Sequence, residues 1–302
     1  MLLLSALDDI GENSAVTIGN FDGFHLGHQK IIEVLCARAK QQQFRSVLLT
    51  FSPHPQAFFG QGIRRIQTDR QRKEWLAGQC LDFSFFVDFG QLAVMEPADF
   101  IGRVLVGRLR MKILVVSRDF RFGRMRQGDL GCLKRESARF GFEVVEVEPQ
   151  MVDGERVSST RIREKLAAGD VVAARRMLGR AYCIDGVVRR GIGRGRSLGF
   201  PTLNFETDNQ LLPPGVFHTR AEIGGRFFES LTNIGSCPTF AGKDQTVETH
   251  VIGFDRMIYG NDVRICFRSK IRDERKFDSG VDLSRQIALD IESIVFDKEA
   301  LF

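Results

Sequence analysis

The apolar pattern of the chain changes near residue 180, and this change constrains the fold more than any other feature. Before it, short apolar runs alternate with patterns of helical spacing. The expected strands are 15–18, 46–51, 83–89, 113–117 and 142–147. The expected helices begin at His28 and span 70–79, 97–109 and 128–140. Strands that alternate with helices predict a doubly wound α/β domain, in which helices cover both faces of a parallel sheet.

After about Tyr182 the apolar residues recur with a period of two. Runs such as 217–223 and 263–267 alternate apolar with polar residues and are separated by Gly, Pro and Asn turns. This pattern predicts an antiparallel sheet or small β-barrel, followed by a helix over 282–296. A chain of 302 residues can bury two cores. We therefore predict two domains, 1–180 and 181–302, joined near 179–181.

Composition and charge predict the compartment and the kinds of partner to expect for this chain. The net charge of +5 is mild and dispersed, which suits anionic small molecules such as nucleotides at least as well as nucleic acid. No apolar run is long enough to span a membrane, and acidic residues follow the short apolar start, so no export signal is read. The six cysteines are scattered singly, which predicts free thiols in a reducing cytoplasm rather than disulfides or a zinc knuckle. We expect a cytoplasmic protein without a nucleic-acid or membrane partner, and an oligomer is left open.

The stretch GNFDGFHLGH follows the expected strand 15–18. His25 and His28 lie three apart at the start of a helix and share one face, where helix N–H groups and the helix dipole already favour anions. Their imidazoles would bind phosphate oxygens as negative charge develops. A His-x-x-His metal site and a tight turn with surface histidines are the alternatives. The residues of this stretch predicted to bind nucleotide are Gly19, Asn20, Phe21 and Asp22.

A second helix start combines hydroxyl and guanidinium groups. In VSSTRIR, Ser159, Thr160 and Arg163 precede or open a helix that ends near Gly169. Such a cluster is typical of phosphate binding, although a plain Ser/Thr cap with solvent-exposed arginines is the alternative. Two such helix starts in one α/β domain favour a nucleotidyl-transfer site.

These motifs follow one another in a familiar order. TIGNFDGFHLGHQ, TFSPHP (50–55), DFRFGRMRQGD (119–129) and VSSTRIR, followed by GRGRSLGFPTLNF (193–205) and RDERKF (272–277), resemble the bacterial bifunctional riboflavin kinase/FAD synthetase family. The resemblance covers essentially the whole chain. It implies that riboflavin and ATP give FMN and ADP, and that FMN and a second ATP give FAD and pyrophosphate. It also implies a nucleotidyltransferase domain followed by a kinase barrel.

In the implied adenylyl transfer, the FMN phosphate attacks the α-phosphorus of ATP. This phosphate is largely dianionic at neutral pH, so the step needs charge stabilisation, Mg²⁺ and positioning rather than a strong base. His25, His28 and Arg163 are the residues we assign to catalysis. By resemblance, Asp119 and Arg121 are expected near the flavin or nucleotide, with a loop salt bridge as the alternative.

The implied kinase step needs a base because a ribityl hydroxyl is a poor nucleophile. Glu248 is the candidate base. It alternates with Val247 and Thr249 along a strand in which the family places a glutamate base. An ordinary surface strand is the alternative. By resemblance, Thr202 and Asn204 hold Mg²⁺ and ATP phosphates, and hard oxygen ligands suit that ion.

The remaining kinase assignments also come from the resemblance. Gly193 and Gly195 would form a flap over the phosphates, and Arg272 would bind flavin. Leu203 stands where the family has alanine and could crowd the kinase site, and Phe217 stands in place of a tyrosine. The alternative function is FMN adenylyl transfer alone, with the barrel only binding flavin. A protein that acts on nucleic acid and a non-catalytic flavin carrier are the rivals from other classes.

Overall fold

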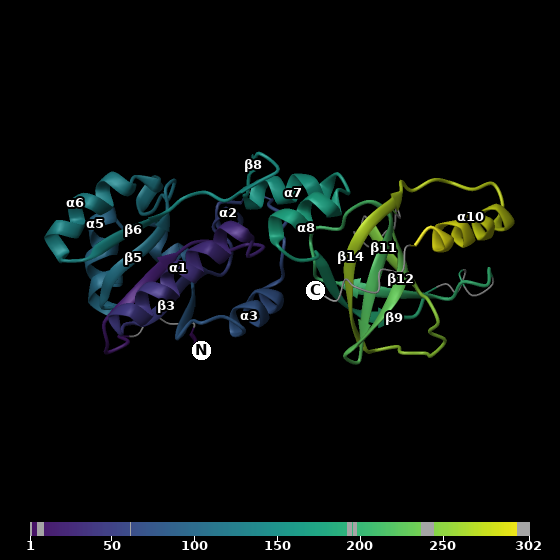
Figure 1. Ribbon diagram of the computed structural model, residues 1–302, viewed down its shortest axis with the longest axis horizontal. Helices are drawn as coiled ribbons and strands as arrows, with labels where there is room; N and C mark the ends of the chain where they lie inside the picture. The colour runs from purple at the N-terminus through teal and green to yellow at the C-terminus, as the bar shows by residue number, and fades with distance from the viewer. Residues whose placement is uncertain are drawn as a thin grey trace. The chain divides into compact units, whose positions relative to one another are not determined.

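The computed structural model describes most of the chain (Figure 1). The described residues are 2–4, 9–60, 62–191, 195, 198–236 and 245–294. Contacts divide the chain into two compact units, Met1–Ser158 and Ser159–Phe302. Helices α7 (Ser159–Ala167) and α8 (Val171–Leu178) fall in the second unit. The functional boundary at residue 180 stays a prediction.

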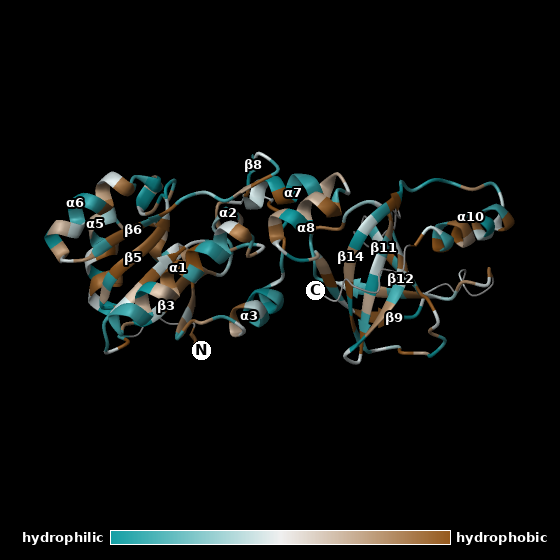
Figure 2. Cartoon of the chain, in the orientation of Figure 1, coloured by the Kyte–Doolittle hydropathy of each residue, from teal (hydrophilic) through white to brown (hydrophobic). Residues whose placement is uncertain are grey.

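The first unit contains a parallel six-stranded sheet in the order β1-β4-β3-β2-β5-β6. Its strands are β1 (Leu2–Leu4), β2 (Ser14–Ile18), β3 (Arg45–Phe51), β4 (Phe83–Val87), β5 (Met111–Ser117) and β6 (Glu143–Val147). The five predicted strands are all present, and β1 is an edge strand that the apolar pattern did not predict. Figure 2 shows hydrophobic residues concentrated in strands such as β5.

Helices cover both faces of this sheet because each strand carries apolar side chains on both sides. Val16 packs in one cluster with Ile101 and Val104, whereas Ala15 packs in a separate cluster with Leu35. The helices are α1 (Leu26–Gln42), α2 (Pro55–Phe58), α3 (Asp69–Ala77), α4 (Phe89–Ala93), α5 (Pro97–Asp99), the π-helix η1 (Phe100–Arg108), the 3₁₀ turn η2 (Arg124–Arg126) and α6 (Leu130–Phe140). A small hairpin, β7 (Met151–Val152) and β8 (Glu155–Arg156), completes the unit. The predicted doubly wound α/β domain is confirmed.

The second unit contains a closed antiparallel barrel in the order β10-β13-β12-β11-β14-β9. Its strands are β9 (Cys183–Arg189), β10 (Thr202–Thr207), β11 (Gly215–Ile223), β12 (Arg226–Ser236), β13 (Gln245–Val251) and β14 (Asp262–Arg272). Phe217, Thr219 and Ala221 are each 0% exposed, as the period of two predicted for their side of the strand. Helix α10 (Gly280–Glu292) follows the barrel. The predicted barrel and C-terminal helix are confirmed.

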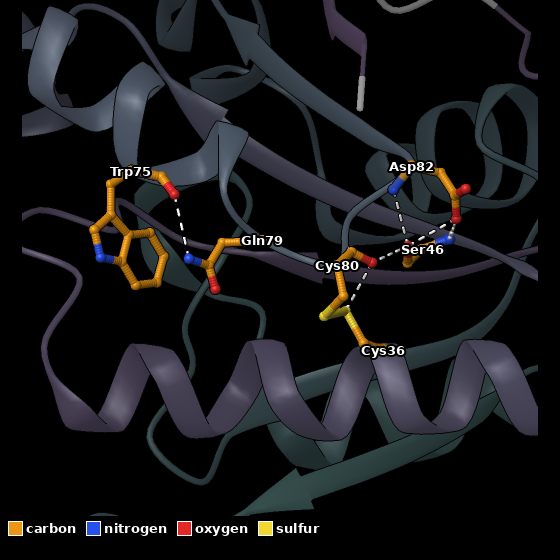
Figure 3. The surroundings of a disulfide bond; sticks show 6 residues. All are labelled: Cys36, Ser46, Trp75, Gln79, Cys80 and Asp82. Atoms are coloured by element: carbon orange, nitrogen blue, oxygen red, sulfur yellow. Dashed lines mark hydrogen bonds between the residues drawn. A yellow bond between two sulfur atoms is a disulfide. The ribbon is translucent and has the colours of Figure 1, made fainter.

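The prediction of free thiols is wrong for four cysteines. Cys36 of α1 is bonded to Cys80 (Figure 3), and Cys183 of β9 is bonded to Cys266 of β14. Cys183 and Cys266 stand directly opposite each other in the antiparallel register, although they are 83 residues apart in sequence. The two cysteines of each pair are brought together only by folding, so their isolated positions in the sequence did not predict the disulfides. Cys132 is free, and Cys237 lies outside the described residues.

We expect these two pairs to be detectable chemically. Alkylation of the denatured, unreduced protein should leave both pairs unlabelled, and peptide mass spectrometry should identify them. The bonds close long loops, so each should raise the free energy of unfolding by about 4 kcal/mol on the loop-entropy model. Reduction should therefore lower the unfolding midpoint. Full labelling without reductant would contradict the pairing.

Candidate active sites

The loop between β2 and α1 has an unusual backbone conformation. Phe21 and Phe24 have left-handed φ values of 46° and 40°, and Gly23 has a φ of 86°. The phenylalanines are 1% and 0% exposed. Left-handed backbone is unfavourable for residues with a side chain, so the loop keeps this shape because its surroundings hold it. Such conformations are commonly found at ligand sites.

His25 and His28 form one unit at the N-terminus of α1. His25 caps the helix, and its Nδ1 accepts a hydrogen bond from the backbone N–H of His28 at 3.3 Å. The two rings are stacked, with 3.7 Å between centroids and 17° between planes. His25 is buried and His28 is half-buried. The pair therefore places two imidazoles together at the positive end of a helix dipole.

The metal-site alternative for this pair finds no support from neighbouring ligands. Among the described residues, no group of three or more His, Cys, Asp or Glu side chains is arranged to hold a metal ion. Binding of phosphate oxygens by the two imidazoles stays a prediction.

Two other predicted residues of the loop have different surroundings. Asp22 is 2% exposed, and its carboxylate accepts hydrogen bonds from the backbone N–H groups of Ile66 at 3.1 and 3.2 Å and Gln67 at 3.3 Å. It thereby fastens the loop to the segment before α3. The side chain of Asn20 is exposed, and half-buried Gly19 donates its N–H to the carbonyl of Leu49. Nucleotide binding by these residues stays a prediction.

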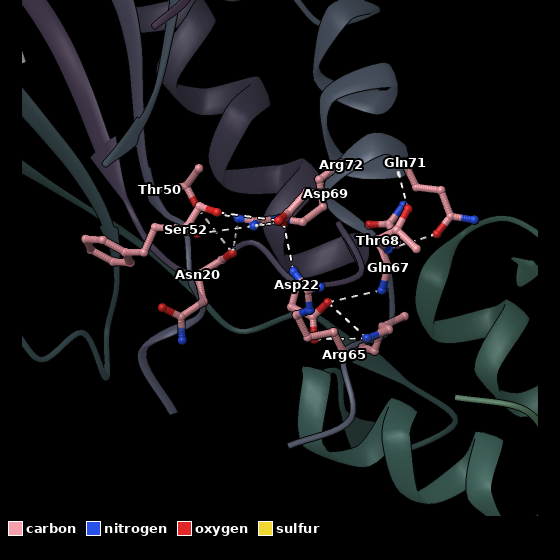
Figure 4. A network of polar contacts seen from close by, with 12 residues as sticks. Asn20, Asp22, Thr50, Ser52, Arg65, Gln67, Thr68, Asp69, Gln71 and Arg72 are labelled. Atoms are coloured by element: carbon pink, nitrogen blue, oxygen red, sulfur yellow. Dashed lines mark hydrogen bonds and ion pairs between the residues drawn. The ribbon is translucent and has the colours of Figure 1, made fainter. Parts of the chain in front are cut away.

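A buried arginine lies beneath the same loop, and sequence reasoning missed it. Arg72 of α3 is 2% exposed and contacts the carbonyl of Asn20, the end of β3 and Asp69 (Figure 4). Burial lowers the pKa of Arg72, although Asp69 and Asp22 act in the opposite direction. The signal in the sequence is its position four residues before buried Leu76, on the same face of α3.

Sequence reasoning also missed a cluster of phenylalanine rings at the carboxyl ends of β3 and β4. Phe89 lies edge-to-face with Phe51, Phe58 and Phe59 at centroid distances of 5.2, 5.7 and 5.8 Å. Phe58 and Phe59 are 47% and 63% exposed. Ligands of open parallel sheets bind beyond the carboxyl ends of the strands. The cluster therefore presents an aromatic surface where a planar ligand would lie.

Asp119 and Arg121 form loop ion pairs, which is the alternative that the sequence left open. Asp119 accepts a hydrogen bond from Arg156 at 2.6 Å, and Arg121 lies 2.9 Å from Asp129. Burial alone would raise the pKa of Asp119, but hydrogen bonds from Arg156 and Ser117 bring it below the usual value. Their expected roles beside a ligand stay predictions.

The residues of the second predicted helix start open α7. Ser159 and Arg163 are half-buried and Thr160 is exposed. Because α7 belongs to the second unit, their expected convergence on His25 and His28 stays a prediction.

The barrel brings together residues that lie far apart in the sequence. Glu248 of β13 stands directly between Asn204 of β10 and Asn233 of β12, and the next pair on the same face of β10 and β13 is Thr202 and His250. Residues directly opposite in an antiparallel sheet share a face. Glu248 is exposed while its neighbours on β13 are buried, so this row lies on the outer face of the barrel. Asn233 was not predicted, because its neighbours are set by strand pairing.

Gly191 and Gly195, which precede β10, lie against the same row. A Cβ on Gly195 would lie 2.9 Å from the hydroxyl of Thr202, and one on Gly191 would overlap the amide of Asn204. Only residues without a side chain fit there. The side-chain oxygens of Thr202 and Asn204, beside the Glu248 carboxylate, are the hard donors that Mg²⁺ prefers. Gly193 lies outside the described residues.

Comparison with known proteins finds a separate family model for each part of the chain. The family model described as FAD synthetase matches residues 8–161, and the one described as riboflavin kinase matches residues 178–295. The chain belongs to the bifunctional riboflavin kinase/FMN adenylyltransferase family. Both activities are therefore those of this enzyme, with ATP, riboflavin, FMN and FAD as substrates or products.

Relatives with that name cover nearly the whole chain. The Haemophilus influenzae protein is 37% identical over 93% of this chain and 93% of its own length. The Escherichia coli K12 protein is 34% identical, with 92% and 91% covered, and the Pseudomonas fluorescens protein is 36% identical, with 91% and 90% covered.

A solved structure shares the fold. A Streptococcus pneumoniae crystal structure described as a macrolide-efflux protein has a TM-score of 0.88 and 28% identity, covering 96% of this chain and 97% of that one. Its described activity is its own. In the described part of the present chain, none of the helices has the length and apolar character needed to cross a membrane.

Three further residues that the sequence singled out in the second unit of this bifunctional enzyme have defined positions. Arg272 binds Asp290 of α10 through three contacts of 2.8 to 3.1 Å, and Asp290 is 2% exposed. This pair fastens the end of β14 to α10, and flavin binding by Arg272 stays a prediction. Leu203 stands opposite buried Thr249, so it lies on the other face of β10 from Asn204 and does not crowd Glu248. Phe217 is 0% exposed, so its ring belongs to the core.

Proposed function

We propose that the bifunctional enzyme carries out adenylyl transfer at the β2–α1 loop and phosphorylation on the outer face of the barrel. The observation that carries this division is the row of Asn204, Glu248 and Asn233, a carboxylate flanked by two amides beside a glycine-rich stretch. The matched ranges of the two family models support assigning 1–180 to the adenylyltransferase and 181–302 to the kinase.

In adenylyl transfer, an oxygen of the FMN phosphate attacks the α-phosphorus of ATP, and the bond to the pyrophosphate oxygen breaks. No proton has to leave the nucleophile, because the phosphate is already ionised. His25 and His28 donate hydrogen bonds to the phosphate oxygens as charge develops, and the N–H groups of α1 add to this stabilisation. Ser159, Thr160 and Arg163 are assigned to the same phosphates.

In the kinase step, the terminal ribityl hydroxyl attacks the γ-phosphorus of ATP, and the bond to the ADP oxygen breaks. Glu248 accepts the hydroxyl proton as the new bond forms. Thr202 and Asn204 would hold Mg²⁺, and Gly193 and Gly195 belong to the stretch that covers the phosphates. When bound, the ion neutralises phosphate charge.

Flavin binding in the first unit is assigned to the phenylalanine cluster. Phe58 and Phe59 expose aromatic rings at the strand ends, and an isoalloxazine ring stacks well on such rings. Asp119 and Arg121, which follow β5, are assigned to the flavin as well, on the family resemblance.

We place the enzyme in the cytoplasm, because both reactions consume ATP. No nucleic-acid partner is included in this assignment. Cell fractionation tests the location, since the enzyme should be recovered with other cytoplasmic proteins.

The direct test is chromatography of flavins after the purified protein is incubated with riboflavin, ATP and Mg²⁺, beside a reaction that starts from FMN. We expect riboflavin to give FMN and then FAD, and chelation of Mg²⁺ to stop both steps. FAD from FMN but nothing from riboflavin would reduce the barrel to a flavin-binding module. No product in either reaction would overturn both assignments.

A further inference from the structure

Arg72 joins three segments of the first unit at one point. Its Nη2 donates to the carbonyl of Asn20 at 2.9 Å and to Oγ1 of Thr50 at 2.7 Å. Its Nη1 donates to the carbonyl of Phe51 at 3.2 Å and to Oδ1 of Asp69 at 3.1 Å. The planar guanidinium of arginine can make these contacts together, because its donors are held in a fixed fork. Figure 4 shows the network from close by.

A buried guanidinium is a costly way to hold a fold together. Arg72 is 2% exposed, burial lowers its pKa, and its Nε has no hydrogen-bond partner among the described residues. Buried ion pairs often stabilise a protein no more than apolar residues of similar volume. Arg72 is therefore better explained by the geometry that it imposes than by a gain in stability.

The geometry concerns the loop that leads into the histidine pair. The carbonyl of Asn20 is fixed by Arg72 immediately before the left-handed residue Phe21. On the other side of Phe21, the Asp22 carboxylate is bound to the backbone N–H groups of Ile66 and Gln67. The loop is thus held at two points, both by the segment that contains and precedes α3. Only four residues, Phe21 to Phe24, separate Asn20 from His25.

We propose that Arg72 is a positioning residue for FMN adenylyl transfer. By fixing the carbonyl of Asn20, it keeps the loop in the conformation that presents His25 and His28 to the phosphates. Arg72 itself touches no substrate. It has this role only if the histidines act as proposed above.

The experiment compares Arg72→Lys and Arg72→Met with the wild-type enzyme in both reactions. Lysine keeps the charge but cannot reach all four acceptors at once. Because a misplacement of about 1 Å can lower a rate about 100-fold, we expect kcat for FAD formation to fall about 10-fold in R72K and about 100-fold in R72M, with KM for ATP nearly unchanged. Riboflavin phosphorylation by the same chain should not change. Arg70→Met is the matched control, since Arg70 is exposed on the same helix.

A double variant separates positioning from a purely structural role. If Arg72 acts through the histidines, R72K should add little to the loss already caused by His28→Ala. Wild-type kcat in R72K and R72M would overturn the inference. The inference would also be overturned if the losses of kcat in R72K and H28A were fully additive. It would be overturned as well if R72K lost the native near-ultraviolet circular dichroism signal to the same extent as it lost kcat. If H28A forms FAD at the wild-type rate, the proposed adenylyl-transfer site is overturned as well. If H28A is impaired in FAD formation but R72K is not, only the inference about Arg72 is overturned.

Discussion

We expect Glu248→Gln to lower kcat for the conversion of riboflavin to FMN by about 1,000-fold, within the range that a general base contributes. Glutamine has nearly the same shape but cannot accept the hydroxyl proton. The side chain is exposed and its neighbours Val247 and Thr249 keep their buried positions, so the register with Asn204 and Asn233 should survive. The measurement is the rate of FMN formation at saturating ATP and Mg²⁺.

The same samples supply the controls. FAD formation from FMN should be unchanged in Glu248→Gln, because that reaction uses the other proposed site. Glu222→Gln changes the same side chain on β11, which is not a neighbour of β13 in the barrel, and should keep both activities. Riboflavin should still bind, as measured by quenching of its fluorescence. FMN formation at the wild-type rate would refute the role of Glu248 as base.

The position of Glu248 illustrates what a local pattern predicts well. The side chains of a strand alternate between its two faces. Glu248 lies between Val247 and Thr249, so these three residues predicted that Glu248 faces the opposite side from its two neighbours. The strands of the α/β unit were predictable for a similar reason, since short apolar runs between helical patterns are typical of a covered parallel sheet. Each of these features depends on neighbours in the sequence.

Features that depend on distant neighbours were not predictable. Asn233 joins the row of Glu248 only through the pairing of β12 with β13, and Cys183 meets Cys266 only through the pairing of β9 with β14. The sequence around an isolated cysteine or asparagine does not predict which distant residue lies beside it in the folded chain. The face of β10 that Leu203 occupies is likewise set by the register with β13, so the local sequence did not reveal it.

The β2–α1 loop shows the limit of reading a motif residue by residue. The sequence around Asp22 did not show that its carboxylate accepts backbone hydrogen bonds from residues 44 and 45 positions later. Arg72 is charged and lies in a helix, which ordinarily indicates exposure. Its burial depends on acceptors supplied by two other segments, and neither is visible from the sequence around it.

His28→Ala is expected to lower kcat for FAD formation from FMN by about 100-fold, the usual effect of removing one donor to developing negative charge. The imidazole of His28 is stacked on that of His25. The variant keeps the backbone N–H of residue 28, which is the group that bonds to Nδ1 of His25, so the helix cap is preserved. His25→Ala would remove the cap as well, and loss of a cap destabilises a helix by about 1 kcal/mol. The rate of FAD formation is measured with FMN and ATP at saturation.

A charge control makes this result specific. Lys30 lies in the same part of α1 and pairs with Glu33 at 2.9 Å on the exposed surface. If the first turn attracted ATP only through general positive potential, Lys30→Ala would also reduce FAD formation, and 0.5 M salt would reduce it in the wild type by screening. We expect neither effect, because direct hydrogen bonds from a half-buried imidazole are screened less than long-range interactions of exposed charges. Wild-type FAD formation in His28→Ala, together with a loss in Lys30→Ala, would replace the histidine pair by a diffuse electrostatic site.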